Sequence, residues 1–344
     1  MSKHKLDYKL WVGIAISAFF LFLLFRKIDF DKLMAAFRQL DYRYIPPALV
    51  LTFVSYFLRA VRWKFLLMPI KNTRLANLFS STLIGYMANN LLPARLGEFV
   101  RAYSLGKKEG IGTSAVFASL VLDRLCDGFT VLLVLLITFF TIHLPAGMER
   151  IQGGLVTGGY VTFALYLAVL AFLTLLKRRT EWTVRLVSRI INPVSARFSE
   201  QMASLMRSFI SGIRVPGKLS QQAAILVSSL LIWASAIWPV DLVLRSFGVT
   251  LPIQASMFIM VFLVFAVMVP ASPGYVGTYH FACVTALSAF NIGPEQALSI
   301  ALVIHGLSFF PVIAAGLYFL WRDKLTLKKI SAENENEHES GATA

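Results

Sequence analysis

Apolar residues occur along this chain in long blocks without the period of an amphipathic helix, as in Leu10 to Phe25 and Phe129 to Phe140. A helix needs about 20 predominantly apolar residues to cross a bilayer. Six transmembrane spans are predicted on this basis, at residues 10–25, 44–64, 114–142, 154–176, 221–245 and 297–321. The pattern therefore predicts an all-α, polytopic membrane protein.

Two further apolar stretches contain helix breakers near their centres. Residues 75–108 include Pro93 and Gly97, and residues 254–290 include a second set. The second set consists of Pro270, Pro273, Gly274 and Gly277. Proline removes a helical hydrogen bond and glycine weakens a helix, so each stretch is predicted to enter the membrane and turn back as a re-entrant hairpin.

The order of these elements repeats along the chain. Residues 1–143 run span, amphipathic segment, span, hairpin, span, and residues 154–321 are expected to repeat that order from the other side of the membrane. Pro93 to Gly97 and Pro270 to Gly274 share the pattern PAxxG at equivalent places. Inverted repeats with broken helices are typical of transporters, whose substrate site lies near the midplane.

Basic residues predict the orientation of the chain. Lys and Arg gather in residues 1–9, 59–74, 95–108, 177–218 and 322–329. Because short cytoplasmic loops carry an excess of Lys and Arg, these segments and both termini are predicted to be cytoplasmic, with the chain in the cytoplasmic (inner) membrane. The tail, residues 322–344, is expected to be disordered.

Composition and charge narrow the choice of partner. Of the 344 residues, 57% are hydrophobic and 15% are charged, whereas soluble domains carry about 25% charged residues. The formal net charge of +15 suits anionic lipid head groups or nucleic acid. The apolar content favours lipid, so membrane lipids are the expected substrate and surface, and nucleic acid is not an expected partner.

Polar and charged residues follow one another closely in the first hairpin. They are Asn89, Asn90, Arg95, Glu98 and Arg101. Non-helical backbone at membrane depth must be buried in protein or line a water-filled cavity. A helix that starts near Pro93 presents free N–H groups to an anion, and two arginines beside it predict a phosphate clamp. The alternative is that these are ordinary charges at the cytoplasmic interface.

Three ionisable residues interrupt the apolar third span: Asp123, Arg124 and Asp127. Arg124 and Asp127 are three residues apart and can pair on one helix face. Ionisable residues inside a membrane indicate a functional site by default. The alternative is an ion pair that only tethers this span to Arg95 or Arg101.

The second hairpin has no Lys, Arg, Asp or Glu between Pro270 and His280. Gly274 and Gly277 allow close approach of the backbone. Its hydroxyl groups belong to Ser272, Tyr275, Thr278 and Tyr279. His280, and with less weight His305 in the last span, can titrate near physiological pH, or can form a structural hydrogen bond instead.

Known catalytic and cofactor signatures are missing from the sequence. It has no HExxH, GxSxG, P-loop or GxGxxG pattern. The histidines lack metal-ligand spacing, and the two cysteines, Cys126 and Cys283, form no CxxC motif. We therefore expect no metal and no cofactor.

Three segments carry a resemblance to a known family: Asn89–Tyr103, Asp123–Asp127 and Pro270–His280. They resemble motifs of the flippase-like membrane family that includes the transmembrane region of lysylphosphatidylglycerol synthase and the UPF0104-type membrane proteins. Asp123, Tyr275 and His280 depart from the family pattern, which has Glu, Gly and Glu there. Because about twenty residues follow the last predicted span, no aminoacyl-transfer domain is expected there, and the resemblance implies lipid translocation.

Two functions follow as expectations. The first is a flippase or transporter, not an enzyme, that moves an amphiphilic, anionic or phosphate-linked lipid across the membrane. The second is a membrane-embedded enzyme or accessory factor that acts on polyprenyl or phospholipid head groups. In the second case Glu98, Asp123, Asp127 and His280 are the acid–base candidates.

Overall fold

The computed structural model describes residues 29–92, 96–141, 149–178, 180–191, 216–268 and 273–325, together with a few isolated positions. Its elements are α2 (Phe30–Arg38), the 3-10 helix η1 (Tyr42–Tyr44), α3 (Ile45–Leu67), α4 (Leu75–Leu91), α5 (Gly97–Glu109), α6 (Thr113–Thr141), α7 (Glu149–Arg178), α8 (Thr180–Ile191), α10 (Leu219–Ser246), α11 (Ile253–Met268), η3 (Pro273–Tyr275), α12 (Thr278–Ser288) and α13 (Pro294–Arg322). No strand occurs among these described residues. The all-α prediction is thereby confirmed.

Several helices are apolar and long, as a polytopic membrane protein requires. Within the described ranges, three are long and apolar enough to cross a membrane: Tyr42–Leu67, Leu219–Ser246 and Pro294–Arg322. The predicted spans at 114–142 and 154–176 correspond to α6 and α7. The predicted span at 10–25, apart from Phe19 and Phe22, and the tail beyond Leu325 lie outside the described residues.

Both interrupted stretches are divided into two helices, α4 with α5 and α11 with α12. The α4–α5 pair is closed tightly, because the Asn89 side-chain oxygen accepts a hydrogen bond from the Gly97 backbone N–H at 2.8 Å. A Cβ on Gly97 would collide with the Gly85 carbonyl oxygen and with Asn89. Glycine at position 97 therefore lets α5 begin directly against α4. Pro93, Arg95, Pro270 and Ser272, at the two breaks, lie outside the described residues.

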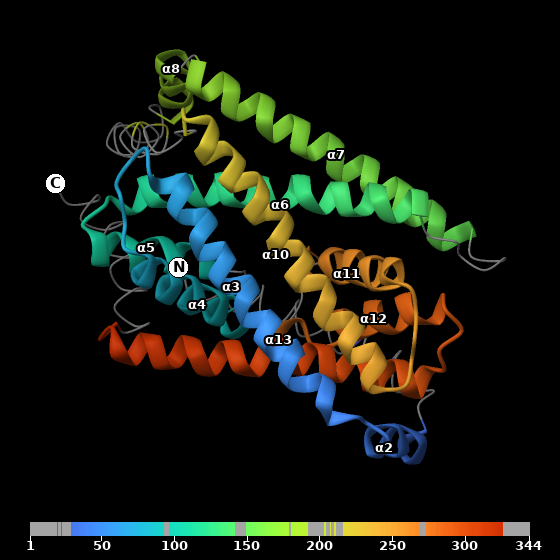
Figure 1. Ribbon diagram of the computed structural model, residues 1–344. Helices are drawn as coiled ribbons and strands as arrows, with labels where there is room; N and C mark the ends of the chain where they lie inside the picture. The colour runs from blue at the N-terminus through green and yellow to red at the C-terminus, as the bar shows by residue number, and fades with distance from the viewer. Residues whose placement is uncertain are drawn as a thin grey trace.

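The two most extensive helix–helix interfaces join parts of the chain that are distant in sequence. α3 and α10 run side by side across the face seen in Figure 1, and α13 packs along α4. In the second contact, a Cβ on Gly316 would lie 2.8 Å from the Leu83 carbonyl oxygen, so the two helix backbones nearly touch. α6 crosses behind α10 and contacts α5, α3, α11 and α7.

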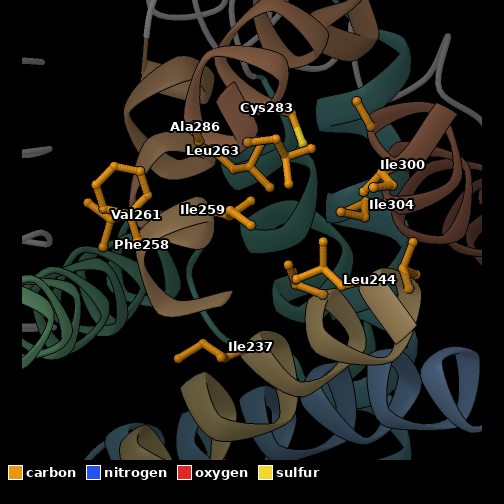
Figure 2. Packing of buried hydrophobic residues seen from close by; sticks show 14 of the residues in the cluster. Ile237, Leu244, Phe258, Ile259, Val261, Leu263, Cys283, Ala286, Ile300 and Ile304 are labelled. Carbon is orange, nitrogen blue, oxygen red and sulfur yellow. The ribbon is translucent and has the colours of Figure 1, made fainter. Parts of the chain in front are cut away.

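A large apolar core lies where α10, α11, α12 and α13 meet (Figure 2). Ile237 and Leu244 reach it from α10, Phe258 and Leu263 from α11, and Ile304 from α13. Burial of such side chains from water contributes roughly 25 cal/mol per Å², but this gain is absent between helices already in lipid, where close packing takes over. The close packing of these side chains therefore fixes the position of the second hairpin.

An ion pair connects the C-terminal ends of α5 and α13. Lys108 pairs with Asp323, which follows the last turn of α13. Burial opposes the charged form of Asp323, but the hydrogen bond and charge of Lys108 hold the pKa of its carboxyl below the usual value. This contact ties the end of the last helix to the first half of the chain.

Candidate functional site

A network of arginines and aspartates lies between α3, α5 and α6. At its centre, Arg62 of α3 is fully buried. Its Nε lies 2.9 Å from Asp123 Oδ1, and its Nη2 lies 2.7 Å from Asp127 Oδ1. The two aspartates are four residues apart in α6 and therefore share one face of that helix. A single guanidinium thus holds both carboxylates.

The inner layer of this network consists of Arg62, Arg101 and Asp123, all of which are buried. Arg101 of α5 donates from Nη1 to Asp123 Oδ2 at 3.1 Å, and its guanidinium lies 4.0 Å from the centre of the Trp63 ring. Arg101 therefore attaches the first hairpin to α6. This arrangement is the tether between Asp123 and Arg101 that the sequence left open as an alternative.

The outer layer consists of Arg59, Arg124 and Asp127. Asp127 Oδ2 accepts from Arg59 Nη1 at 2.7 Å and lies 3.3 Å from Arg124 Nη1, the i, i+3 pair that the spacing predicts. Tyr86 of α4 organises the two arginines, because its hydroxyl accepts from Arg124 at 2.9 Å and its ring lies about 6 Å from each guanidinium. The Arg124 side chain is 38% exposed, against 0% for Asp123.

Positive charge exceeds negative charge in this network. Four arginines surround two aspartates, and Glu98, in the first turn of α5, adds one further carboxylate that attracts Arg124. A buried charge is costly unless it is paired. The surplus therefore favours an anion beside the outer layer.

The outer layer forms one wall of a cavity of about 470 Å³. Arg59, Tyr86, Arg124 and Asp127 line this wall, together with hydroxyl groups of α3 such as Ser55. The opposite walls are apolar and come mainly from α10, α11 and α13: Val240, Val243, Met260, Leu263, Phe265 and Leu307. A cavity with one cationic wall and several apolar walls suits an amphiphile with an anionic group.

A chain of hydrogen bonds closes the second hairpin against α13. The Gly277 backbone N–H donates to His280 Nδ1 at 3.4 Å, and His280 Nε2 lies 3.1 Å from His305 Nδ1. Because Nδ1 of His280 accepts, a neutral His280 carries its proton on Nε2 and donates it to His305. Tyr279 stacks on His305 with ring centres 4.7 Å apart and lines the cavity. The histidine pair thus helps to hold Tyr279 in place in the cavity wall.

The two hairpins approach each other at their breaks. η3 contacts α4, and a Cβ on Gly274 would lie 3.7 Å from the Asn90 carbonyl oxygen and 2.8 Å from the Phe309 ring. Gly274 also has φ +75°, a conformation that glycine adopts readily. Residues of both hairpins, Tyr86 and Tyr279, line the same cavity.

The sequence-predicted residues fall into three groups. Arg124, Asp127 and Tyr279 line the cavity. The described residues behind it or at the hairpin turns are Asn89, Asn90, Gly97, Glu98, Arg101, Asp123, Pro273, Gly274, Tyr275, Gly277 and His280. The remainder, Pro93, Arg95, Pro270 and Ser272, lie outside the described residues, so the proposed partnership of Arg95 with Arg101 has no described geometry.

Sequence reasoning missed Arg59, Arg62 and Tyr86. Arg59 and Arg62 were counted, like Arg101, among basic residues of cytoplasmic segments, but they lie in the network with Asp123 and Asp127. A usable signal was present, because Arg59 and Arg62 are three residues apart in or next to an apolar span, where they share a face. Tyr86 gave no signal, since an aromatic residue in a span is ordinary.

Comparisons with known proteins identify related membrane proteins. The family model described as the lysylphosphatidylglycerol synthase TM region matches residues 10–316. A UPF0104 membrane protein of Methanothermobacter thermautotrophicus is 26% identical over 92% of this chain and 94% of its own length. Glycosyltransferase AglD of Haloferax volcanii is 25% identical over 89% of this chain but only 53% of AglD. No solved structure matches the chain with significance.

These matches confirm the family that the motifs predicted and correct one expectation. The chain was expected not to be an enzyme. That expectation is wrong, because the family is named after a synthase and one relative is named a glycosyltransferase. Both names point to an enzyme-related role in a lipid-related membrane family.

Proposed function

Because the chain belongs to the family of the lysylphosphatidylglycerol synthase transmembrane region, we propose that it is a membrane-embedded enzyme component or accessory factor that acts on polyprenyl or phospholipid head groups. One observation carries the proposal: Arg59 and Arg124 face an otherwise largely apolar cavity. The phosphate group of the lipid binds these two arginines, and the start of its apolar chain lies along α10 and α11.

The chemistry of the outer layer fits phosphate. Guanidinium groups bind phosphate oxygens through paired, charge-assisted hydrogen bonds. The cavity, at about 470 Å³, has the size of a small-molecule site, roughly 300–1,000 Å³. It therefore accommodates a head group and the first part of a chain, and the rest of the chain extends into the bilayer.

The enzyme-related part of the proposal rests on which acid–base candidates reach the cavity. Among Glu98, Asp123, Asp127 and His280, Asp127 is the one that contributes to the lining. One carboxylate held by three arginines is poorly suited to transfer a proton. We therefore favour a role in which this chain binds the lipid and presents it to a catalytic partner, as an accessory component of an enzyme system.

Transbilayer movement of the same lipid is a second candidate, favoured by reciprocal helix contacts. In the proposed repeat, α3, α4 and α6 of the first half correspond to α10, α11 and α13 of the second. The contact of α4 with α13 then corresponds to that of α11 with α6, and the contact of α10 with α6 corresponds to that of α3 with α13. Such reciprocity supports the proposed repeat of residues 1–143 and 154–321. Its inverted orientation, the cytoplasmic termini and the six spans belong to the same proposal.

Reconstitution of the full chain into vesicles with labelled phospholipid tests both candidates. We expect anionic phospholipid to be retained through purification, and the double variant Arg59→Ala, Arg124→Ala to retain about tenfold less, because two charge-assisted contacts are lost. Arg245→Ala, which breaks the Arg245–Asp241 pair away from the cavity, is the matched control. A new lipid product on adding a candidate transferase supports the accessory role, and movement without a product supports translocation. Equal retention by all three proteins would contradict both.

A further inference from the structure

The outer layer already contains an anion of its own, the Asp127 carboxylate. Arg59 Nη1 at 2.7 Å and Arg124 Nη1 at 3.3 Å both point to the same oxygen, Oδ2. Two guanidinium groups that converge on one carboxylate oxygen are arranged as they would be around one phosphate oxygen. Asp127, Arg59 and Arg124 all line the cavity, so a ligand can reach this contact.

We propose that Asp127 is an internal substitute for the anionic group of the ligand: the lipid phosphate competes with this carboxylate for Arg59 and Arg124 and displaces it. This inference rests on the proposed function, since it concerns how the same site takes its lipid. It predicts that a substitution in the site increases the affinity for the ligand, where a loss of affinity would normally be expected. Removing the charge of Asp127, a residue that lines the site, tightens the binding of an anionic lipid.

The other oxygen of Asp127 explains how displacement leaves the network intact. Oδ1 accepts from Arg62 Nη2 at 2.7 Å, and Arg62 belongs to the buried inner layer. When Arg59 and Arg124 turn to the ligand, Asp127 stays paired through Oδ1. The carboxylate therefore does not become an unpaired buried charge, which would be costly.

Asp123 is the matched comparison, four residues earlier in the same helix. Arg62 holds its Oδ1 at 2.8 Å and Arg101 holds its Oδ2 at 3.1 Å, both from the inner layer, and Arg124 of the outer layer reaches Oδ2 only at 3.5 Å. Its side chain is fully buried, and it is not among the residues that line the cavity. Asp127 lines the cavity and contacts both Arg59 and Arg124, whereas Asp123 does not line it and has one longer contact with Arg124. The competitor role therefore belongs to Asp127.

Binding of short-chain lipids to the full chain in detergent tests the proposal. The probes are dioctanoyl phosphatidylglycerol, dioctanoylglycerol, which lacks the phosphate, and inorganic phosphate, which lacks the chains. Asp127→Asn is expected to bind dioctanoyl phosphatidylglycerol about tenfold more tightly than the wild type, because hydrogen bonds to charged groups are among the stronger ones. Asp123→Asn is expected to show no gain, and dioctanoylglycerol no difference among the proteins. A gain with inorganic phosphate as well would identify the phosphate alone as the competing group.

Equal or weaker binding of phosphatidylglycerol by folded Asp127→Asn overturns the proposal, and Asp127→Ser serves if the Asn variant fails to fold. If neither folds, difference infrared spectra of the wild type decide: phosphatidylglycerol must shift an aspartate carboxylate band, and an unchanged spectrum overturns the proposal. Failure of the proposed function looks different. In that case the Arg59→Ala, Arg124→Ala variant binds phosphatidylglycerol as well as the wild type, whereas failure of this inference alone leaves that variant impaired.

Discussion

The two hairpins solve the same structural problem with different chemistry. Each breaks a helix in apolar surroundings, and each presses a glycine against a neighbour, Gly97 against α4 and Gly274 against the Phe309 ring. The first hairpin is anchored by Arg101, which pairs with Asp123. The second is anchored by the neutral contact of His280 with His305. Position in the fold therefore does not dictate whether ions or neutral dipoles hold a hairpin.

The difference supports the proposed position of the ligand. Buried ion pairs are a weak source of stability, because desolvation offsets most of the attraction between the charges. A neutral hydrogen bond, such as the one in the second hairpin, carries a smaller desolvation cost than a buried ion pair. Local rules are broken mainly at functional sites, which supports the proposal that the lipid head group binds beside the arginine network of the first hairpin. The second hairpin contributes apolar packing and part of the cavity wall.

The largest expected effect comes from removing the arginine that joins both layers. Arg62→Leu leaves Asp123 and Asp127 short of a partner inside the protein, which should destabilise the fold by about 3–5 kcal/mol. Thermal unfolding of the purified protein in detergent measures this loss. The control Arg207→Leu breaks the exposed pair of Arg207 with Glu181 and should cost about 0–1 kcal/mol. Similar losses in the two variants would show that the buried network contributes no more to stability than an exposed ion pair.

The next largest effects on stability are expected from substitutions of the hairpin glycines. Gly97→Ala places a methyl group against the Gly85 carbonyl and should cost about 1–3 kcal/mol, because a backbone atom cannot move aside easily. Gly274→Ala meets the end of the Phe309 ring, which can shift, but it also forces alanine to φ +75°. Gly112→Ala has open space and serves as the neutral reference. Unfolding temperatures rank the three, and a neutral Gly97→Ala would refute the tight closure of the first hairpin.

A double-mutant cycle sharpens the comparison at the second hairpin. His280→Leu, His305→Leu and the double variant should give a coupling energy of about 0.5–1.5 kcal/mol, the value of a neutral hydrogen bond. Ser81 and Ser104, whose hydroxyl oxygens are 3.0 Å apart between α4 and α5, provide an equivalent cycle in the first hairpin. Additive losses for the histidines would mean that their contact does not hold the second hairpin.

The smallest effect is expected at two of the tyrosines that line the cavity, Tyr86 and Tyr279. Tyr86→Phe keeps the ring beside both arginines but removes the hydroxyl that accepts from Arg124, so phosphatidylglycerol affinity should fall by about threefold, less than 1 kcal/mol. Tyr279→Phe keeps the ring stacked on His305 and should leave that affinity unchanged. The same short-chain lipid titration measures both. A larger loss at Tyr279 would move the head group toward the second hairpin.

Much of the architecture could be predicted from the sequence because lipid imposes simple local requirements. Apolar length predicted the helices, so that α6, at Thr113–Thr141, nearly coincides with the expected span at 114–142. Pro and Gly predicted where the two interrupted stretches divide. The polar run Asp123, Arg124 and Asp127 marked α6 as unusual, because ionisable residues are costly in a membrane. These signals are read within a single helix.

Tertiary structure alone decided which charges meet and which of them a ligand can reach. Arg59 and Asp127 are 68 positions apart in sequence, and nothing in either segment specifies that α3 packs with α6 on the faces that carry them. A count of basic residues assigns Arg62 to a loop because Arg62 lies near the end of a span. Such a count does not consider which face of the helix the side chain occupies. Asp123 and Asp127 look equivalent in sequence, yet one is sealed behind Arg62 and the other lines the cavity. The physical reason is that burial of a charge depends on the neighbouring helices that surround it, and those neighbours are set by packing over the whole molecule.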